Sequence, residues 1–199
     1  MPRIITGLFK GKLLETPEGR EVRPTSDRVR TSVFNILHSW LPGKKVLDLY
    51  SGCGAIGLEC LSRGAEMAVM VERAPEALRC LENNRERLGA KERSLIWKAD
   101  VWDALKRPAP FTADLIYADP PYREADVPAL LAAIDGSGFA NYDTIVIIEH
   151  DDTVKYLKGQ EEGLWRCYRA NSYGKAQVSF FGRTASFANE ETPDNKEEE

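Results

Sequence analysis

The chain has 199 residues with a formal net charge of -4, and 43% of them are hydrophobic. This length suits one domain with a small appendage. No apolar run approaches the ~20 residues that span a bilayer, and the first ten residues are a poor match to a signal peptide, so we expect a cytoplasmic protein without a membrane segment. The four cysteines form no CxxC pair and only two histidines occur, which predicts no metal site.

The charge is unevenly distributed. Six acids and one lysine fall within residues 190–199, and we expect the acidic tail 184–199 to be disordered. The first thirty residues carry seven Lys or Arg against four acids, which suggests a polyanionic partner, with a solvated surface as the alternative. The candidate contacts are Lys10, Lys12, Arg20, Arg23, Arg28 and Arg30.

The N-terminal part precedes a long helix. Residues 3–15 alternate loosely and contain two glycines, which predicts a small β-hairpin, so residues 1–24 form an extension. Thr25 or Ser26 can cap the helix that follows, whose apolar residues recur at helical spacing until Pro42.

Short apolar strands then alternate with helices, which predicts a mostly parallel sheet covered on both faces. A final β-rich stretch, 164–183, turns at Gly174 and predicts an antiparallel hairpin at the sheet edge. The sequence thus predicts an α/β fold with a seven-stranded sheet in a domain spanning 25–183. The five expected parallel strands are 45–50, 67–72, 94–100, 114–121 and 144–150, and the expected helices between them are 55–63 and 75–88.

The first strand leads into a glycine-rich loop. Gly52, Gly54 and Gly57 have the G-x-G-x-x-G spacing between a strand and a helix, and Glu72 follows 20 positions after Gly52. Such a carboxylate can bind a ribose diol while the glycines let the backbone approach a ligand. The loop therefore predicts a cofactor that contains a nucleoside, in preference to a glycine turn without a ligand.

Two acids decide between the candidate cofactors. Asp48 stands at the end of the strand, where it would repel the pyrophosphate of NAD but suit the cationic ammonium of S-adenosylmethionine. Asp100, at the end of the third strand, can accept a hydrogen bond from an adenine amino group. S-adenosylmethionine is therefore favoured over NAD, and the predicted contacts also include Ser51, Arg73 and Val101.

The fourth strand ends in Asp119-Pro120-Pro121-Tyr122. The lone pair of a nucleobase amino group is delocalised into the ring, so the group is a poor nucleophile. Asp119 and the Pro120 carbonyl can accept hydrogen bonds from that amino group and localise its lone pair, and proline holds its carbonyl in place. Tyr122 can stack on a base taken out of its helix. This motif predicts N-methylation of a nucleobase, against the alternative of a proline-stiffened turn.

The sequence resembles the bacterial 16S ribosomal RNA guanine-N2 methyltransferase family over about residues 3–183. The matching stretches are RIITGLFKGKLL, RPTSDRVRTSVFNIL, DLYSGCGAIGLE and DPPY. The resemblance implies a Rossmann-like methyltransferase with an N-terminal β-hairpin that helps to hold RNA. It also implies that Asp119 to Tyr122 hold the target guanine and that Pro24 and Thr25 contact the methionine end of the cofactor.

The resemblance further implies 16S rRNA within a small-subunit assembly intermediate as the partner of a monomeric enzyme. Two departures concern the details: Thr31 stands where the family pattern leads us to expect an acid, and the loop reads SGCG where AGSG is commoner. A DNA adenine-N6 methyltransferase, which shares the acid-Pro-Pro-aromatic motif, and a small-molecule methyltransferase are the main alternatives. A third is a non-catalytic RNA-binding module that has kept the fold, against which the intact DPPY argues.

Overall fold

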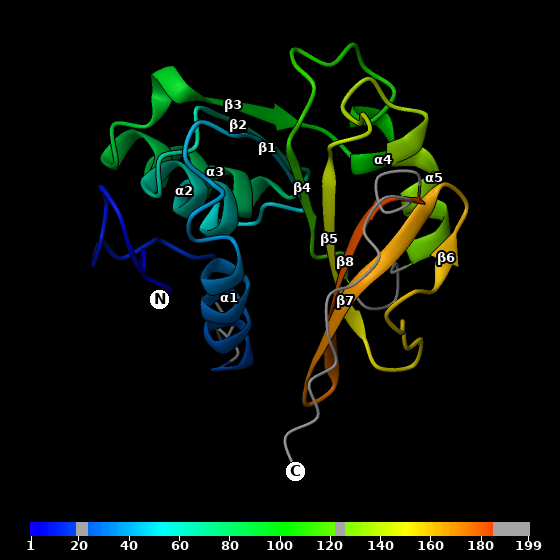
Figure 1. Cartoon of the computed structure of the whole chain (residues 1–199). Coiled ribbons are helices and arrows are strands. Elements are labelled where there is room, and N and C mark those ends of the chain that lie inside the picture. The colour runs from blue at the N-terminus through cyan, green and yellow to red at the C-terminus, as the bar shows by residue number, and fades with distance from the viewer. Residues whose placement is uncertain (19–23, 122–125, 185–199) are drawn as a thin grey trace.

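The computed structural model describes residues 1–18, 24–121 and 126–184, with residues 24–27 described by their backbone alone. Its centre is an eight-stranded sheet in the order β3-β2-β1-β4-β5-β8-β7-β6 (Figure 1). Strands β1 to β5 are parallel, whereas β8, β7 and β6 continue the sheet in antiparallel pairing. The strands are β1 (Lys45–Leu49), β2 (Met67–Glu72), β3 (Ser94–Lys98), β4 (Leu115–Ala118), β5 (Ile145–Asp151), β6 (Glu161–Glu162), β7 (Trp165–Tyr173) and β8 (Ala176–Arg183).

Helices cover both faces of the sheet, as the apolar strands require. The first three helices lie on one face and the last two on the other (Figure 1). A short 3-10 turn, Lys91–Arg93, leads into β3. The helices are α1 (Pro24–Ile36), α2 (Ala55–Ser62), α3 (Pro75–Arg87), α4 (Val101–Ala104) and α5 (Val127–Asp135).

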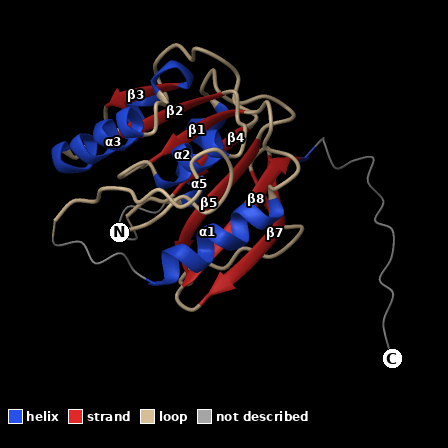
Figure 2. Cartoon of the chain, turned by 90° about the vertical axis from the view of Figure 1, so that its left-hand side faces the viewer, coloured by secondary structure: helices blue, strands red, loops and turns tan. Residues whose placement is uncertain are grey.

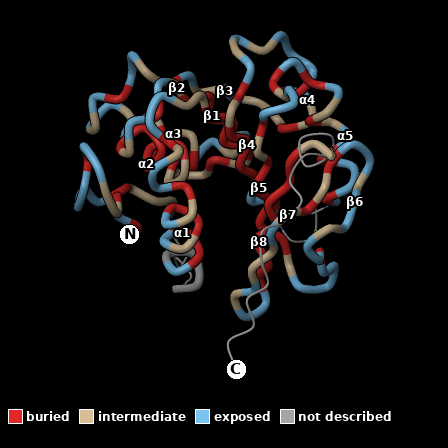
Figure 3. Tube along the Cα trace, viewed as in Figure 1, coloured by how far each residue is buried: buried red, intermediate tan, exposed pale blue. Residues whose placement is uncertain are grey.

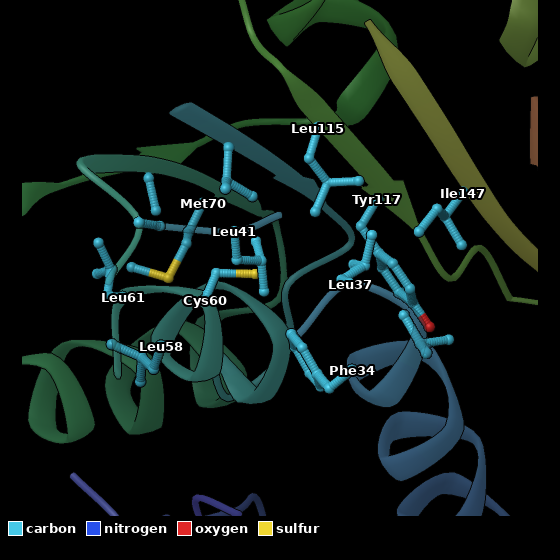
Figure 4. Packing of buried hydrophobic residues seen from close by; sticks show 14 of the residues in the cluster. Phe34, Leu37, Leu41, Leu58, Cys60, Leu61, Met70, Leu115, Tyr117 and Ile147 are labelled. Carbon is cyan, nitrogen blue, oxygen red and sulfur yellow. The ribbon is translucent and has the colours of Figure 1, made fainter. Parts of the chain in front are cut away.

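Burial is concentrated along the central strands and the helix faces that meet them (Figure 3). On the first face, Phe34 of α1 and Leu58 of α2 pack with Met70 and Tyr117 of the strands (Figure 4). Alternate strand residues face the second cluster, beneath α4 and α5. Each large apolar side chain removed from water contributes roughly 1.5–3 kcal/mol.

Helix α1 extends over the antiparallel half of the sheet, where Ser32 Oγ hydrogen-bonds to Tyr173 Oη (Figure 2). It begins at Pro24, one residue before the predicted cap, because proline fits the first turn of a helix. It ends at Ile36 rather than near Pro42, and hydrogen-bonded turns span the interval.

The predicted α/β class and C-terminal hairpin are confirmed, and three details are corrected. The short β6 makes eight strands rather than seven. The predicted N-terminal hairpin is reduced to one antiparallel bridge between Arg3 and Leu13, where Ile4 N bonds to Lys12 O and Leu14 N to Pro2 O, while the next donors, at Ile5, Thr6 and Phe9, bond to α2. Helices α4 and α5 were not predicted. The acidic tail from residue 185 onward lies outside the described residues.

No helix in residues 1–18, 24–121 and 126–184 is both long enough and apolar enough to cross a membrane. The same ranges contain no cluster of three or more His, Cys, Asp or Glu side chains that could hold a metal ion.

Candidate cofactor and target-base site

The sheet order changes direction between β1 and β4. The chain moves outward from β1 through β2 to β3, and then returns to place β4 on the other side of β1. The carboxyl ends of neighbouring strands at such a switch point are where open α/β sheets bind ligands. The glycine loop follows β1 and Asp119 follows β4, so the two motifs found in the sequence meet at this place.

The glycine loop adopts backbone conformations that few residues tolerate. Tyr50 has φ 60°, Gly52 has φ 56° and Gly54 has φ 86°. A Cβ on Gly54 would lie 2.4 Å from Leu81 Cδ1, whereas a Cβ on Gly52 would meet nothing within 4 Å. The left-handed backbone at Gly54 and the leucine side chains around it therefore both favour glycine, while Gly52 faces space that no described residue fills and that a ligand can enter. The left-handed Tyr50, a non-glycine residue, is the kind of local strain that occurs at binding sites.

Asp48 is a buried carboxylate that hydrogen-bonds to the end of the glycine loop. Its side chain is 1% exposed, and its Oδ2 accepts a hydrogen bond from the backbone N–H of Gly57 at 2.9 Å. Burial raises the pKa of Asp48 to about 7, an effect that the charge of Glu72 reinforces and that hydrogen bonds from Gly57 and Ser51 oppose. Asp48 thus shapes the loop as well as being the predicted partner of a cationic ammonium group.

Gly57 allows α2 to approach the sheet closely. A Cβ at this position would lie 2.7 Å from Met70 Sδ and 3.1 Å from Asp48 Oδ2. Ser51, also in the loop, donates its hydroxyl to the backbone oxygen of Asp48 at 2.7 Å.

Glu72 ends β2 beside the loop, with its carboxylate directed at backbone donors. Oε2 accepts from Gly52 N at 2.8 Å, and Oε1 accepts from Arg73 N at 2.8 Å and Ala74 N at 2.7 Å. These three bonds fix the carboxylate at the position that the sequence predicts for a ribose-binding acid. They also link the loop after β1 to the turn after β2, a connection that the spacing did not reveal.

Asp100 lies after β3, the next strand outward. Its Oδ1 caps α4 by accepting from Trp102 N at 2.9 Å, and its Oδ2 forms an ion pair with Arg73 Nη1 at 2.8 Å. Two of the predicted cofactor residues therefore hold each other. Val101, also predicted, is 3% exposed in the first turn of α4.

After β4 the chain presents an accessible acid on a fixed backbone. Asp119 is exposed, whereas Pro120 behind it is buried and Pro121 is exposed. Tyr122, which the sequence predicts to stack on the target base, lies outside the described residues.

A buried polar pair lies beneath Asp119. Tyr117 Oη donates to Glu149 Oε2 of β5 at 3.3 Å, and Glu149 is 9% exposed. Burial raises the pKa of Tyr117 well above its ordinary value, and the charges of Glu149, Asp119 and Asp48 reinforce this. The ends of β1, β4 and β5 therefore share one acidic environment. Glu149 was not among the predicted residues, since one acid within an apolar strand carries no local signal.

The predicted RNA contacts are divided by the structure. Lys10, Lys12 and Arg28 are exposed and available to a partner. Arg30 is 5% exposed and donates from Nη2 to the backbone oxygen of Arg3 at 2.8 Å, so its prediction as a phosphate contact is corrected: it lies beneath the N-terminal segment. Arg20, Arg23 and the side chains of Pro24 and Thr25 lie outside the described part of the chain.

Two polar residues of α2 hold residues 1–18, which we call the N-terminal segment. Glu59 is fully buried and accepts from the backbone N–H groups of Ile5 and Thr6 at 2.6 and 3.1 Å. Ser62 Oγ donates to the oxygen of Thr6 at 2.6 Å and accepts from Phe9 N at 2.9 Å. The segment thus docks on a helix through side chains, which sequence reasoning missed because both helix residues look like surface positions.

These residues fit a cofactor that carries a nucleoside and an amino acid. The edge offers open space over Gly52, as far as the described residues go, and acids at or near the ends of three neighbouring strands. A model of the family described as "Conserved hypothetical protein 95" matches residues 2–182. The chain belongs to this family.

Proteins and solved structures that are similar to this chain support the same fold and chemistry. "Putative rRNA methyltransferase YlbH" of Bacillus subtilis is 35% identical over 157 residues, covering 77% of this chain and 84% of that protein. "Ribosomal RNA small subunit methyltransferase D" of Escherichia coli is 26% identical over 189 residues, covering 92% and 90%. The solved "Putative methyltransferase yhhF from Escherichia coli" has a TM-score of 0.79 at 25% identity, covering 92% and 97% of the two chains.

The matches confirm the resemblance inferred from the sequence and the Rossmann-like methyltransferase fold. The predicted cofactor, S-adenosylmethionine, agrees with a solved putative methyltransferase of the same fold that is complexed with SAH. The role of each residue at the site remains a prediction of the motifs and the geometry.

Proposed function

We propose that this chain transfers a methyl group to the exocyclic N2 of a guanine in the 16S rRNA of the small ribosomal subunit. The observation that carries the proposal is the accessible Asp119, followed by two prolines, at the sheet switch point beside the glycine loop. Its relatives match it over most of its length and are named as rRNA methyltransferases, which supports RNA as the substrate class.

The proposed cofactor site is formed by the ends of β1, β2 and β3. Glu72 would accept the ribose hydroxyls, Asp100 the adenine amino group, and Asp48 the ammonium group, while Gly52 leaves room for the ligand. Bound there, S-adenosylmethionine supplies a methyl group on a sulfonium centre. These residues only bind and orient, and most of the rate enhancement would come from that positioning.

The proposed target site is formed by the residues after β4. The Asp119 carboxylate and the Pro120 carbonyl would accept hydrogen bonds from the guanine amino group and turn its lone pair toward the methyl donor. The amine would gain one N–C bond as the methyl–sulfur bond of the donor breaks and leaves S-adenosylhomocysteine. The amine must also lose one proton, which Asp119 can accept before passing it to solvent. Pro120 is buried, so its carbonyl is held by the surrounding core while Asp119 remains accessible.

Substrate choice tests the proposal. Purified protein and labelled S-adenosylmethionine should be incubated with naked 16S rRNA, assembled small subunits, subunit precursors and duplex DNA. We expect label in RNA, most strongly in an assembly intermediate, and none in DNA. Label in DNA adenine would establish the DNA adenine-N6 alternative, and label in neither polymer would leave a small-molecule methyltransferase. We further propose that the protein is a cytoplasmic monomer. Light scattering of the purified protein tests its oligomeric state.

A further inference from the structure

One buried side chain joins the N-terminal segment to the cofactor loop. Asn84 of α3 is 1% exposed and uses both ends of its amide. Its Oδ1 accepts from Glu15 N at 2.8 Å, and its Nδ2 donates to Glu15 O at 2.9 Å and to Cys53 O at 3.0 Å. Cys53 stands between Gly52 and Gly54. The orientation of the central peptide of the loop is therefore tied to the docking of the segment on α3.

Other hydrogen bonds tie the loop to the sheet, including one from Ser51 N–H to the backbone oxygen of Val71 at 2.9 Å. Gly57 N–H is held by Asp48, and Gly52 N–H by Glu72. Asn84 differs from these anchors because it also bonds to the backbone of Glu15, in the N-terminal segment. Removing its hydrogen bonds would take the donor Asn84 Nδ2 from the half-buried Cys53 carbonyl and release the Glu15 backbone, so the segment and the loop would loosen together.

A hollow lies over Asn84, between the N-terminal segment and α3. Its volume is about 190 Å³, and Lys12, Leu13, Asn84, Arg87 and Leu88 line it. Lys12 belongs to the segment and Arg87 to the last turn of α3, and the described residues that line the hollow include no acid. A phosphate held by both cations would bind only when the segment is docked, because undocking would carry Lys12 away from Arg87.

We propose that a backbone phosphate of the RNA substrate binds in this hollow between Lys12 and Arg87, and that Asn84 couples this contact to the glycine loop. The inference rests on the proposed RNA substrate. RNA and cofactor would both favour the docked segment, so each should strengthen the binding of the other by the same factor. Arg87 thereby joins the predicted RNA contacts, from a helix outside the basic N-terminus.

The test measures the dissociation constant of S-adenosylhomocysteine by calorimetry, with and without a small-subunit rRNA fragment, at one ionic strength. For the wild-type protein we expect RNA to tighten this binding by about fivefold or more, within the usual range of coupled sites. The Arg87→Ala variant should lower RNA affinity, reduce the log–log salt slope of RNA binding by roughly 0.7–0.9, and bring the coupling factor close to one.

A matched control lies on the same helix. Arg79 is exposed on α3 and does not line the hollow, so Arg79→Ala removes the same charge and should retain the wild-type coupling factor. The Asn84→Asp variant keeps the shape of the side chain but loses both Nδ2 donors, and it should also abolish the coupling. If Asn84→Asp fails to fold, as judged by circular dichroism, the surface variant Arg87→Ala still decides.

Equal coupling factors in Arg87→Ala and wild type would overturn the proposal, as would a wild-type factor of one while rRNA is still methylated. If inorganic phosphate at matched ionic strength tightens S-adenosylhomocysteine binding as much as RNA does, the hollow is a free-anion site and the RNA assignment is overturned. Absence of methyl transfer to any rRNA is a separate result, which removes the proposed function before the coupling is considered.

Discussion

Replacing Glu72 with alanine should weaken cofactor binding more than any other change at the end of β2. The carboxylate already accepts three backbone N–H bonds, which hold it in place. A ribose diol would add hydrogen bonds to a charged acceptor, each worth about 1.5–3 kcal/mol. The loss of one such bond corresponds to about a 10- to 150-fold increase in the dissociation constant.

The same substitution has a second effect on the protein itself. The N–H of Gly52 is partly buried, and without its acceptor it is satisfied only if water reaches it. Thermal unfolding should therefore be measured first, so that binding is compared below the melting transition. Glu72→Gln should fall between wild type and Glu72→Ala, because one amide oxygen remains to accept while the amide NH2 would face backbone donors.

Calorimetric titration with S-adenosylhomocysteine is the assay, and Glu76→Ala is the matched control. Glu76 is exposed in the first turn of α3, so the substitution removes the same charge close to the site without removing a contact to the loop. A dissociation constant for Glu72→Ala within twofold of that for Glu76→Ala would refute the assignment of the ribose to Glu72.

Three further predictions follow from the site. Asp119→Ala should lower methyl transfer by roughly 10²-fold or more while cofactor affinity stays near wild type, since the acid faces the target amine; equal turnover numbers would refute its role. Burial raises the pKa of Asp48 to about 7. Between about pH 4 and about pH 7 the unfolded chain has lost this proton while the folded protein keeps it, so the cofactor-free protein should become easier to unfold as the pH rises through this range. Cofactor affinity should rise over the same window, and Asp48→Asn should flatten both profiles. Replacing Lys10 and Lys12 with alanine should weaken RNA binding and flatten its salt dependence, as filter binding across a salt series would show.

The strands and the glycine loop could be predicted because their signals are local. An apolar run between two helices, such as residues 67–72, is readily interpreted as a strand, and the bounds of β2 agree with this prediction at both ends. The spacing of Gly52 and Glu72 places both at one edge of the sheet, and the bond between them confirms that register. The packing requirement at Gly57 likewise follows from a motif that lies within a few residues.

The remaining features depend on contacts between distant parts of the chain. Glu59 and Asn84 occupy helix positions that look solvent-exposed in sequence, yet both are buried because residues 3–15 cover them. The same cover removes Arg30 from the surface. The two arms of the segment pair only around Arg3 and Leu13, because the donors of Ile5, Thr6 and Phe9 bond to side chains of α2. Helix α4 has only four residues, too few to show a helical period.

The identity of the methylated base tests the central claim most directly. Ribosomal RNA treated with the protein and S-adenosylmethionine should be digested to nucleosides and analysed by mass spectrometry, with Asp119→Ala as the parallel reaction. We expect N2-methylguanosine at one position of 16S rRNA with the wild-type protein and almost none with the variant. A product methylated on adenine N6 or on a ring atom, or equal product from both proteins, would contradict the proposed reaction.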